Sequence, residues 1–153
     1  MTEGQARPRS ATSEGAIEVE QTIRKVLEMW AGGLEPTLAS WREFATPDLV
    51  WWNSARGAVN GLEECLAGIR TFYETMSVDH VKVPIRSVVS GRDGLVFVER
   101  SDDTYLTDGS LLAAVPVVGV VRFRDGKIVE WRDYCDDWVA KLGFSVDAEF
   151  QER

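Results

Sequence analysis

The feature of this sequence that most constrains its fold is a change of hydrophobic period at Val78. Before that residue, apolar side chains recur at three- and four-residue steps, the spacing of one face of an amphipathic helix. After it, β-rich runs are separated by the short turn sequences SGRDG, TDGS and RDGK. The runs are Val78–Val89, Leu95–Thr107, Leu111–Arg124 and Lys127–Tyr134. Because such short turns join antiparallel neighbours, we expect an α+β fold whose long curved sheet packs over helices and leaves a pocket.

Three helices are expected before this sheet. The first spans Ile17–Trp30 and ends at the glycine pair that follows it. The second has Pro36 in its first turn, and the third carries an apolar stripe from Leu62 to Met76. Local signals also predict a capping box formed by Asn60 and Glu63, a short strand over Leu49–Asn53, and a brief closing helix near Asp137–Leu142.

Length and composition limit what the chain can be. Its 153 residues suffice for a single domain, which we place at residues 17–153, after a leader at residues 1–16 that we expect to be disordered. The net charge of −8 argues against nucleic acid or an anionic membrane as partner. No apolar run reaches the ~18 residues of a membrane span, and the leader lacks the apolar core of a signal peptide. With Cys65 and Cys135 as the two cysteines, we expect a reduced, cytoplasmic protein.

Strand alternation brings three charged residues to inward faces. Arg100 and Asp102 share a face with the valines that precede them, and Asp133 falls on the face of Trp131 and Cys135. An unpaired ion there would cost several kcal/mol, whereas a guanidinium between two carboxylates can bond both. One added proton makes this trio neutral, so that one aspartate can act as an acid and the other as a base. A purely structural ion-pair network is the alternative reading.

Other polar residues are weaker candidates. Asn53 shares a strand face with Trp51, and its amide either orients a water molecule or merely begins the following turn. Cys135 has no evident base, because His80, the single histidine, alternates with Lys82 and is expected to face solvent. The acidic pairs of the chain lack a ligand loop, so no metal site is expected.

With these residues identified, the chain resembles the limonene-1,2-epoxide hydrolase family. The likeness is densest in DGLVFVERSD and VVGVVRFRDGKIVEWRDY, and it extends more loosely through MSVDHV and WWN to the first helix. The resemblance implies a cone-shaped α+β fold like that of nuclear transport factor 2 and ketosteroid isomerase, with a mixed, mostly antiparallel sheet on three N-terminal helices. It also implies a homodimer that opens a hydrophobic epoxide with water in one step, without a cofactor.

The resemblance further implies a role for each polar residue of the site. Asp133 matches the base that deprotonates the water, Asp102 the acid that protonates the epoxide oxygen, Arg100 the bridge between them, and Asn53 a residue that holds the water. The chain departs from the family at Trp51, where the family has a tyrosine that helps to bind the water. An indole N–H donates a hydrogen bond but accepts none. Either Asn53 and Asp133 alone position the water, or Trp51 reshapes the pocket for another substrate.

Parity and the resemblance together suggest the walls of the pocket, although each of these residues could equally belong to the core. The position of Cys135, aromatic in relatives, enlarges the pocket locally. Such walls would accept terpene-like or polyketide-like carbon skeletons. The suggested wall residues are Trp51, Met76, Val78, Val81, Val98, Val115, Val117, Trp131 and Cys135.

Two further functions stay open at this stage. An isomerase or polyketide cyclase on the same scaffold would use one carboxylate as a base at a carbon acid. Such a site needs an oxyanion donor but no second acid tied to an arginine, so the trio counts against it. A non-catalytic module would instead bind a small molecule without turnover.

Overall fold

A computed structural model of the chain describes residues 11–135, and side chains from residue 14 onward. Three helices precede most of the sheet: α1 (Ala11–Trp30), α2 (Leu34–Phe44) and α3 (Leu62–Met76). The strands are β1 (Ala45–Asn53), β2 (Gly57–Asn60), β3 (Val78–Lys82), β4 (Ile85–Ser90), β5 (Leu95–Leu106), β6 (Leu111–Arg124) and β7 (Lys127–Cys135). The first helix begins at Ala11, before the predicted start at Ile17. The closing helix predicted near Asp137–Leu142 lies outside the described residues.

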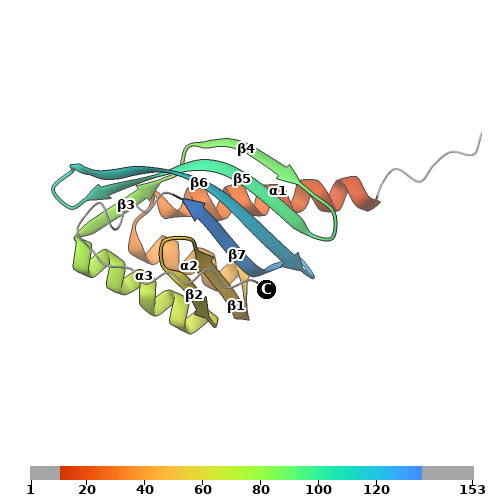
Figure 1. Cartoon of the computed structure of the whole chain (residues 1–153), viewed down its shortest axis with the longest axis horizontal. Coiled ribbons are helices and arrows are strands. Elements are labelled where there is room, and N and C mark those ends of the chain that lie inside the picture. The colour runs from red at the N-terminus through yellow and green to blue at the C-terminus, as the bar shows by residue number, and fades with distance from the viewer. Residues whose placement is uncertain (1–10, 136–153) are drawn as a thin grey trace, which may run out of the picture.

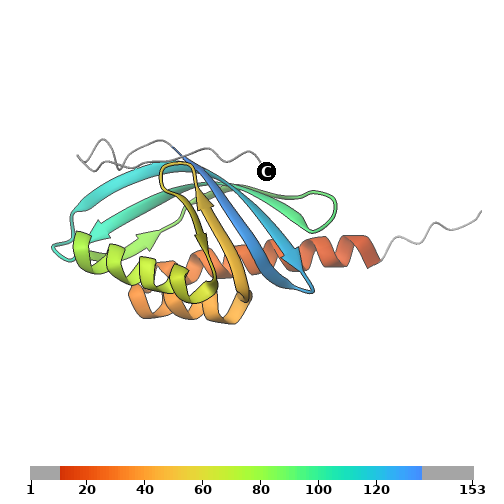
Figure 2. The same cartoon turned by 60° about the horizontal axis from the view of Figure 1, so that its bottom comes forward.

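The strands form one seven-stranded sheet in the order β2-β1-β7-β6-β5-β3, with β4 also paired to β5. Neighbours run antiparallel except β1 and β7, which are parallel, so the sheet is mixed. Figures 1 and 2 show the sheet curling over the three helices, which lie on its concave side. The expected α+β class and the curved, mostly antiparallel sheet on three helices are confirmed.

The strands also differ from the predicted ones: β1 begins at Ala45 rather than at Leu49, and two further differences have local reasons. The run Val78–Val89 is two strands, β3 and β4, which pair with different parts of β5. Pro84 lies between them, and proline has no N–H to continue a ladder. The segment after β1, expected to be a turn, contains the short strand β2, so that β1 and β2 form a hairpin at the edge of the sheet.

The predicted capping box at the start of α3 is wrong. Asn60 ends β2 opposite Val50, and the residue at the N-cap is Gly61, which makes no side-chain capping bond. Gly61 has a φ of 95°, a conformation that favours glycine, and its N–H donates to the carbonyl of Leu49 at 2.7 Å. This backbone bond ties the start of α3 to β1.

A β-bulge in β7 corrects one face assignment. The register of β6 and β7 passes from Arg122 opposite Glu130 to Phe123 opposite Ile128, which leaves Val129 as an extra residue. The bulge reverses the alternation before Glu130. Ile128, predicted to share the charged outer face, is therefore fully buried, while Trp131 and Asp133 keep the inward orientation that was predicted.

The core fills the space between the concave face of the sheet and the helices. Its largest fully buried side chains are Trp41 and Trp131, whose ring centroids lie 5.1 Å apart in an edge-to-face arrangement. Leu38 of α2 and Val98 of β5 are also fully buried in this cluster. Since each fully buried aliphatic side chain stabilises the fold by about 1.5–3 kcal/mol, this layer supplies a rigid base for the polar residues above it. None of the helices in residues 11–135 has the length and apolar character to span a membrane.

Candidate active site

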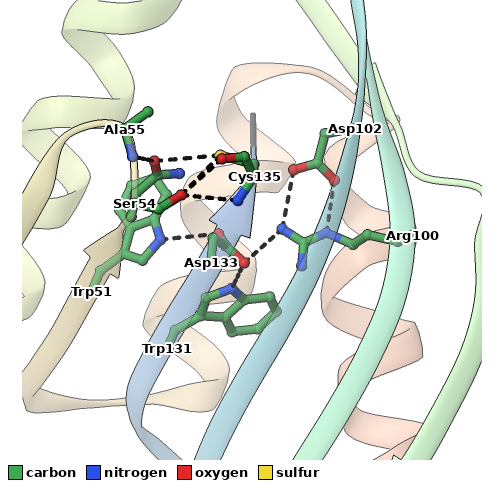
Figure 3. A network of polar contacts seen from close by, with 9 residues as sticks. Trp51, Ser54, Ala55, Arg100, Asp102, Trp131, Asp133 and Cys135 are labelled. Carbon is green, nitrogen blue, oxygen red and sulfur yellow. Dashed lines mark hydrogen bonds and ion pairs between the residues drawn. The ribbon is translucent and has the colours of Figure 1, made fainter. Parts of the chain in front are cut away.

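Arg100 lies between two carboxylates on the concave face of the sheet (Figure 3). Its Nε and Nη2 donate to the two oxygens of Asp102 at 2.7 and 3.0 Å, and Nη2 also donates to Oδ1 of Asp133 at 2.9 Å. The side chain of Arg100 is 0% exposed, that of Asp133 4% and that of Asp102 23%. The predicted trio is therefore assembled, with Asp102 as its more open end.

Asp133 also accepts two indole N–H groups. Trp131 Nε1 donates to Oδ1 at 2.8 Å, and Trp51 Nε1 donates to Oδ2 at 3.3 Å. Figure 3 shows both indoles on the side of Asp133 away from Asp102. Together with Arg100, these indoles give Asp133 three hydrogen-bond donors among the described residues. Trp51, which stands where the epoxide hydrolase family has a tyrosine, thus donates a hydrogen bond to the carboxylate itself.

The register of the central strands makes room for the guanidinium. Gly119 of β6 lies opposite Val98 on one side and Asp133 on the other. A Cβ at this glycine would lie 2.6 Å from Arg100 Nη1 and 2.8 Å from Val98 Cγ1. Any larger residue at position 119 would therefore displace the side chain that bridges the two carboxylates.

Burial and charge act in opposite directions on the members of the trio. Removal from water would lower the pKa of Arg100, but the Asp133 and Asp102 carboxylates outweigh burial and raise it, so the guanidinium stays charged. Burial raises the pKa of Asp102 above its ordinary value, helped by the nearby Asp133 and Asp103 charges and opposed by Arg100. Asp102 is thus the member of the trio whose environment favours holding a proton.

Asn53 fills one of the two roles considered for it, the start of the turn after β1. Its Oδ1 accepts the N–H of Ala55 at 2.8 Å, and its backbone carbonyl accepts the N–H of Arg56 at 3.0 Å, so it does begin the turn after β1. A backbone donor at Oδ1 fixes the orientation of the amide, whose nitrogen has no hydrogen-bond partner among the described residues. The parallel register places Asn53 beside Asp133, and both line the same cavity. An N–H donor therefore lies next to the carboxylate.

A cavity of about 180 Å³ opens at these residues. It is somewhat larger than the ~150 Å³ apolar cavity that holds a benzene molecule, so it fits a body of about one ring. Most of its walls are apolar or aromatic, whereas Asp102, Asp133 and Asn53 give it polar groups. Of the predicted wall residues, five line it: Trp51, Val81, Val115, Val117 and Cys135.

The other four predicted wall residues are not part of the cavity lining. Val78, Val98 and Trp131 are buried in the core beneath it, and Met76 packs against that core from the end of α3. The alternation of side chains along each strand correctly predicted that the strand residues point inward. It could not show that Trp30 and Trp41 from the helices pack against Trp131.

Several wall residues lie outside the set that sequence reasoning found. Trp30, Trp41, Ile69, Phe72 and Tyr73 come from the inward faces of the three helices. Their helical periodicity marked them as buried, but only the packing of the helices on the sheet brings them to one cavity. Thr37 and Tyr73 also line it, and their hydroxyl oxygens lie 3.1 Å apart. Since Thr37 donates its own proton to the Gly33 carbonyl, Tyr73 is the donor of this pair.

The thiol and histidine side chains form no reactive pair. His80 contacts Asp79 at 2.6 Å and stacks on Tyr105, and it does not line the cavity that contains Cys135. The Cys135 thiol donates to Asn53 Oδ1 at 3.6 Å, and burial raises its pKa. Within residues 11–135, no group of three or more His, Cys, Asp or Glu side chains is arranged to hold a metal ion.

Comparison with known proteins identifies the family of this chain. The sequence profile of the SnoaL-like domain family matches residues 23–131. The chain belongs to the SnoaL-like domain family. The predicted cone-shaped SnoaL-like fold, related to that of nuclear transport factor 2, is thereby confirmed.

Solved structures with the same fold have different stated activities. A candidate SnoaL-like polyketide cyclase from Jannaschia sp. CCS1 matches with a TM-score of 0.68 at 21% identity, over 95% of this chain and 99% of that one. An LEH-like epoxide hydrolase from M. tuberculosis matches with a TM-score of 0.67 at 23% identity, over 84% and 90%. A candidate isomerase from Bacillus subtilis has a TM-score of 0.66 at 22% identity, over 85% and 96%. At these identities the matches show a shared fold, so the activity of this SnoaL-like domain must be argued from its own site.

Proposed function

We propose that this SnoaL-like domain is an epoxide hydrolase that opens a hydrophobic epoxide with water, giving a diol. The observation that carries the proposal is Arg100, which donates to Asp102 and to Asp133 at 2.7 to 3.0 Å while the two carboxylates meet a single cavity. A base and an acid on either side of a small ring are what one-step opening by water requires.

The proton inventory fits that reaction. With one proton on Asp102, the trio is neutral, and ionised Asp133 faces the cavity beside the free amide nitrogen of Asn53. Asn53 holds a water oxygen while Asp133 removes a water proton, and the resulting hydroxide attacks one epoxide carbon. As that carbon–oxygen bond breaks, Asp102 gives its proton to the departing oxygen. The product is a diol, and the proton that Asp133 gained then returns to Asp102.

The reaction needs no further reagent in this scheme. Water supplies the nucleophile and one proton, Asp102 lends the other, and Arg100 keeps the two carboxylates at a fixed separation. We therefore propose a cofactor-free hydrolase. From the two cysteines and the leader without an apolar core, we also propose that it acts in the cytoplasm.

A second candidate is an isomerase or polyketide cyclase that uses Asp133 alone as a base at a carbon acid. The observation in its favour is Trp51, whose N–H occupies Asp133 Oδ2 at 3.3 Å, where the epoxide hydrolase family has a tyrosine that binds water. Against it stands Asp102, whose contact with Arg100 gives a second acid that such a reaction does not need.

A panel of cyclic and linear epoxides tests the proposal. We expect diol release from at least one of them, with a loss of about 10²–10⁴-fold in rate for Asp133→Asn and for Asp102→Asn. Asp108→Asn is the control, since Asp108 is an exposed aspartate of the β5–β6 turn that bonds Ser110 and does not line the cavity. Diol formation undiminished in Asp133→Asn would refute the mechanism. Proton exchange into a carbonyl substrate without any diol would favour the second candidate, and ligand binding without turnover would favour a binding module.

A further inference from the structure

One arginine at the cavity lies apart from the trio. Arg56 belongs to the turn between β1 and β2, where its N–H donates to the carbonyl of Asn53. Its side chain is exposed at the protein surface and also lines the cavity, so it marks the cavity mouth. The guanidinium carbon lies 5.2 Å from the ring centroid of Phe72 in α3, which lines the same cavity. The contact orients the cation across the mouth, between the hairpin and the helix.

Arg56 has no carboxylate partner among the described residues. Three arginines whose side chains reach the surface do have one, since Arg70, Arg86 and Arg124 contact carboxylate oxygens at 3.2 to 3.3 Å. Arg92, like Arg56, has none within residues 11–135, but it lies outside the cavity lining. The two carboxylates of the cavity are taken by Arg100. Burial against the cavity wall lowers the pKa of Arg56, and the opposing effect comes from Cys135. A partly desolvated guanidinium with free N–H donors favours an anionic ligand, above all a planar carboxylate that it can bond through two parallel N–H groups.

The charges along the cavity also favour an anionic ligand. With one proton, the trio at the sheet is neutral, so Arg56 leaves the cavity with a positive mouth in a chain whose net charge is −8. Ile69, Phe72 and Val115 of the same cavity supply apolar wall. A ligand that satisfies all three regions has a reacting group near Asp102 and Asp133, an apolar body, and an anion at the mouth.

We propose that Arg56 binds a carboxylate of the substrate, so that the hydrolase acts on amphiphilic epoxides that also carry a carboxylate. This inference rests on the proposed function for its reacting group, but the carboxylate site itself is independent of turnover. It makes Arg56 a specificity residue, which selects acids over their neutral analogues.

Unreactive ligands test the site directly. The probes are cyclohexyl carboxylates with side chains of increasing length, each compared with its primary amide, and the dissociation constants are measured by calorimetry. We expect the wild-type protein to bind the acid of best length at least about tenfold more tightly than its amide. Arg56→Gln abolishes this preference and leaves amide binding unchanged.

The matched control is Arg92→Gln. Arg92 is an exposed arginine of the β4–β5 turn, outside the cavity lining and without an ion pair among the described residues, so its loss changes the net charge equally. This variant should keep the preference for the acid. Equal binding of acid and amide by the wild type, no binding of either, or an equal effect of the two substitutions would each overturn the proposal.

Kinetics separate this inference from the proposed function. With an epoxide that carries a carboxylate, Arg56→Gln should raise KM about tenfold or more and leave kcat near its wild-type value, because the contact is the same in the ground and transition states. If no epoxide is hydrolysed while the acid preference persists, the proposed function fails and the carboxylate site stands. If diol forms but acid and neutral epoxides have equal KM values, the carboxylate site fails instead.

Discussion

Asp102 and Asp133 contact the same guanidinium, yet they differ in their hydrogen-bond partners and in their exposure. Asp133 accepts hydrogen bonds from Arg100, Trp131 and Trp51, whereas Asp102 accepts side-chain bonds within residues 11–135 from Arg100 alone. Each hydrogen-bond donor stabilises a negative charge on a carboxylate, whereas burial away from water destabilises such a charge. We therefore propose that Asp102 carries the proton of the trio and acts as the acid, while Asp133 acts as the base.

The activity should follow the ionisation of Asp102. Burial raises the pKa of this carboxyl above its ordinary value of 3.8, and only the protonated form can give a proton to the epoxide oxygen. We expect kcat/KM for diol formation to fall as the pH rises through the raised pKa of Asp102. A pH–rate profile measures it, and a profile that rises steadily across the range up to neutral pH would contradict this assignment.

The same shift should appear in stability. A carboxyl group whose pKa is higher in the folded than in the unfolded chain contributes stability that is complete below the unfolded pKa and lost as the pH rises through the folded pKa. The free energy of unfolding of Asp102→Asn should therefore lack this loss, so its difference from the wild type should change with pH. Urea denaturation at a series of pH values measures the difference, and parallel curves for the two proteins would show that the Asp102 pKa is not raised.

At the scale of elements, the site depends on the register of β5, β6 and β7. Pairing sets Gly119 between Val98 and Asp133, and the missing side chain leaves the space that the Arg100 guanidinium occupies. A one-residue shift of β6 would put Val118 or Val120 there and close this space.

Gly119→Ala tests the role of that space. Because the added Cβ would lie 2.6 Å from Arg100 Nη1, we expect a loss of about 1–3 kcal/mol in the free energy of unfolding, as for overpacking. Displacement of Arg100 should also lower the rate about 10²-fold, since misplacement of this order costs that much. Gly15→Ala in α1, where a Cβ meets nothing within 4 Å, is the control and should be neutral or stabilising. Unchanged stability and rate in Gly119→Ala would contradict the packing account.

The sequence allowed the elements and the trio to be predicted because both follow local rules. Alternation along β5 is regular, so Arg100 and Asp102 faced inward together with the valines before them. The failures occurred where a backbone feature broke the local rule. The bulge at Val129 reversed the face of Ile128, and Gly61 took the cap that Asn60 was expected to form.

The helix side of the cavity could not be predicted for another reason. Phe72 and Tyr73 read as the apolar stripe of a helix, which is the same whether the stripe faces core or cavity. The roles of Gly119 and Arg56 depend on strands and helices distant in sequence. These residues carry no local signal, and only the packed molecule relates them to the site.

At the scale of the whole molecule, the outer face of the sheet carries exposed apolar side chains. The helices cover the concave face, whereas Phe97, Val118 and Tyr134 of β5, β6 and β7 are 43%, 44% and 40% exposed. Neighbouring exposed apolar side chains on a sheet are typical of an interaction surface. We propose that a second copy of the chain covers this outer face, giving the homodimer that the resemblance implied.

Val118→Lys tests the dimer, because a charge at the centre of an apolar interface costs several kcal/mol to bury. We expect the wild type to sediment as a dimer at micromolar concentration and the variant as a monomer, by analytical ultracentrifugation. Thr71→Lys, at an exposed position of α3 on the helix side of the sheet, is the control and should leave the dimer intact. A monomeric wild type would refute the dimer proposal and leave the hydrolase proposal untouched.

The central claim, that Asp133 acts as a base on water and never as a nucleophile, is tested most directly by a single turnover in heavy-oxygen water. With enzyme in excess over epoxide, water attack predicts that the first diol formed carries one heavy oxygen from the solvent. Mass spectrometry of the diol and of the protein measures the label. First-turnover diol with ordinary oxygen, together with label in the Asp133 carboxylate, would show a covalent ester and contradict this account.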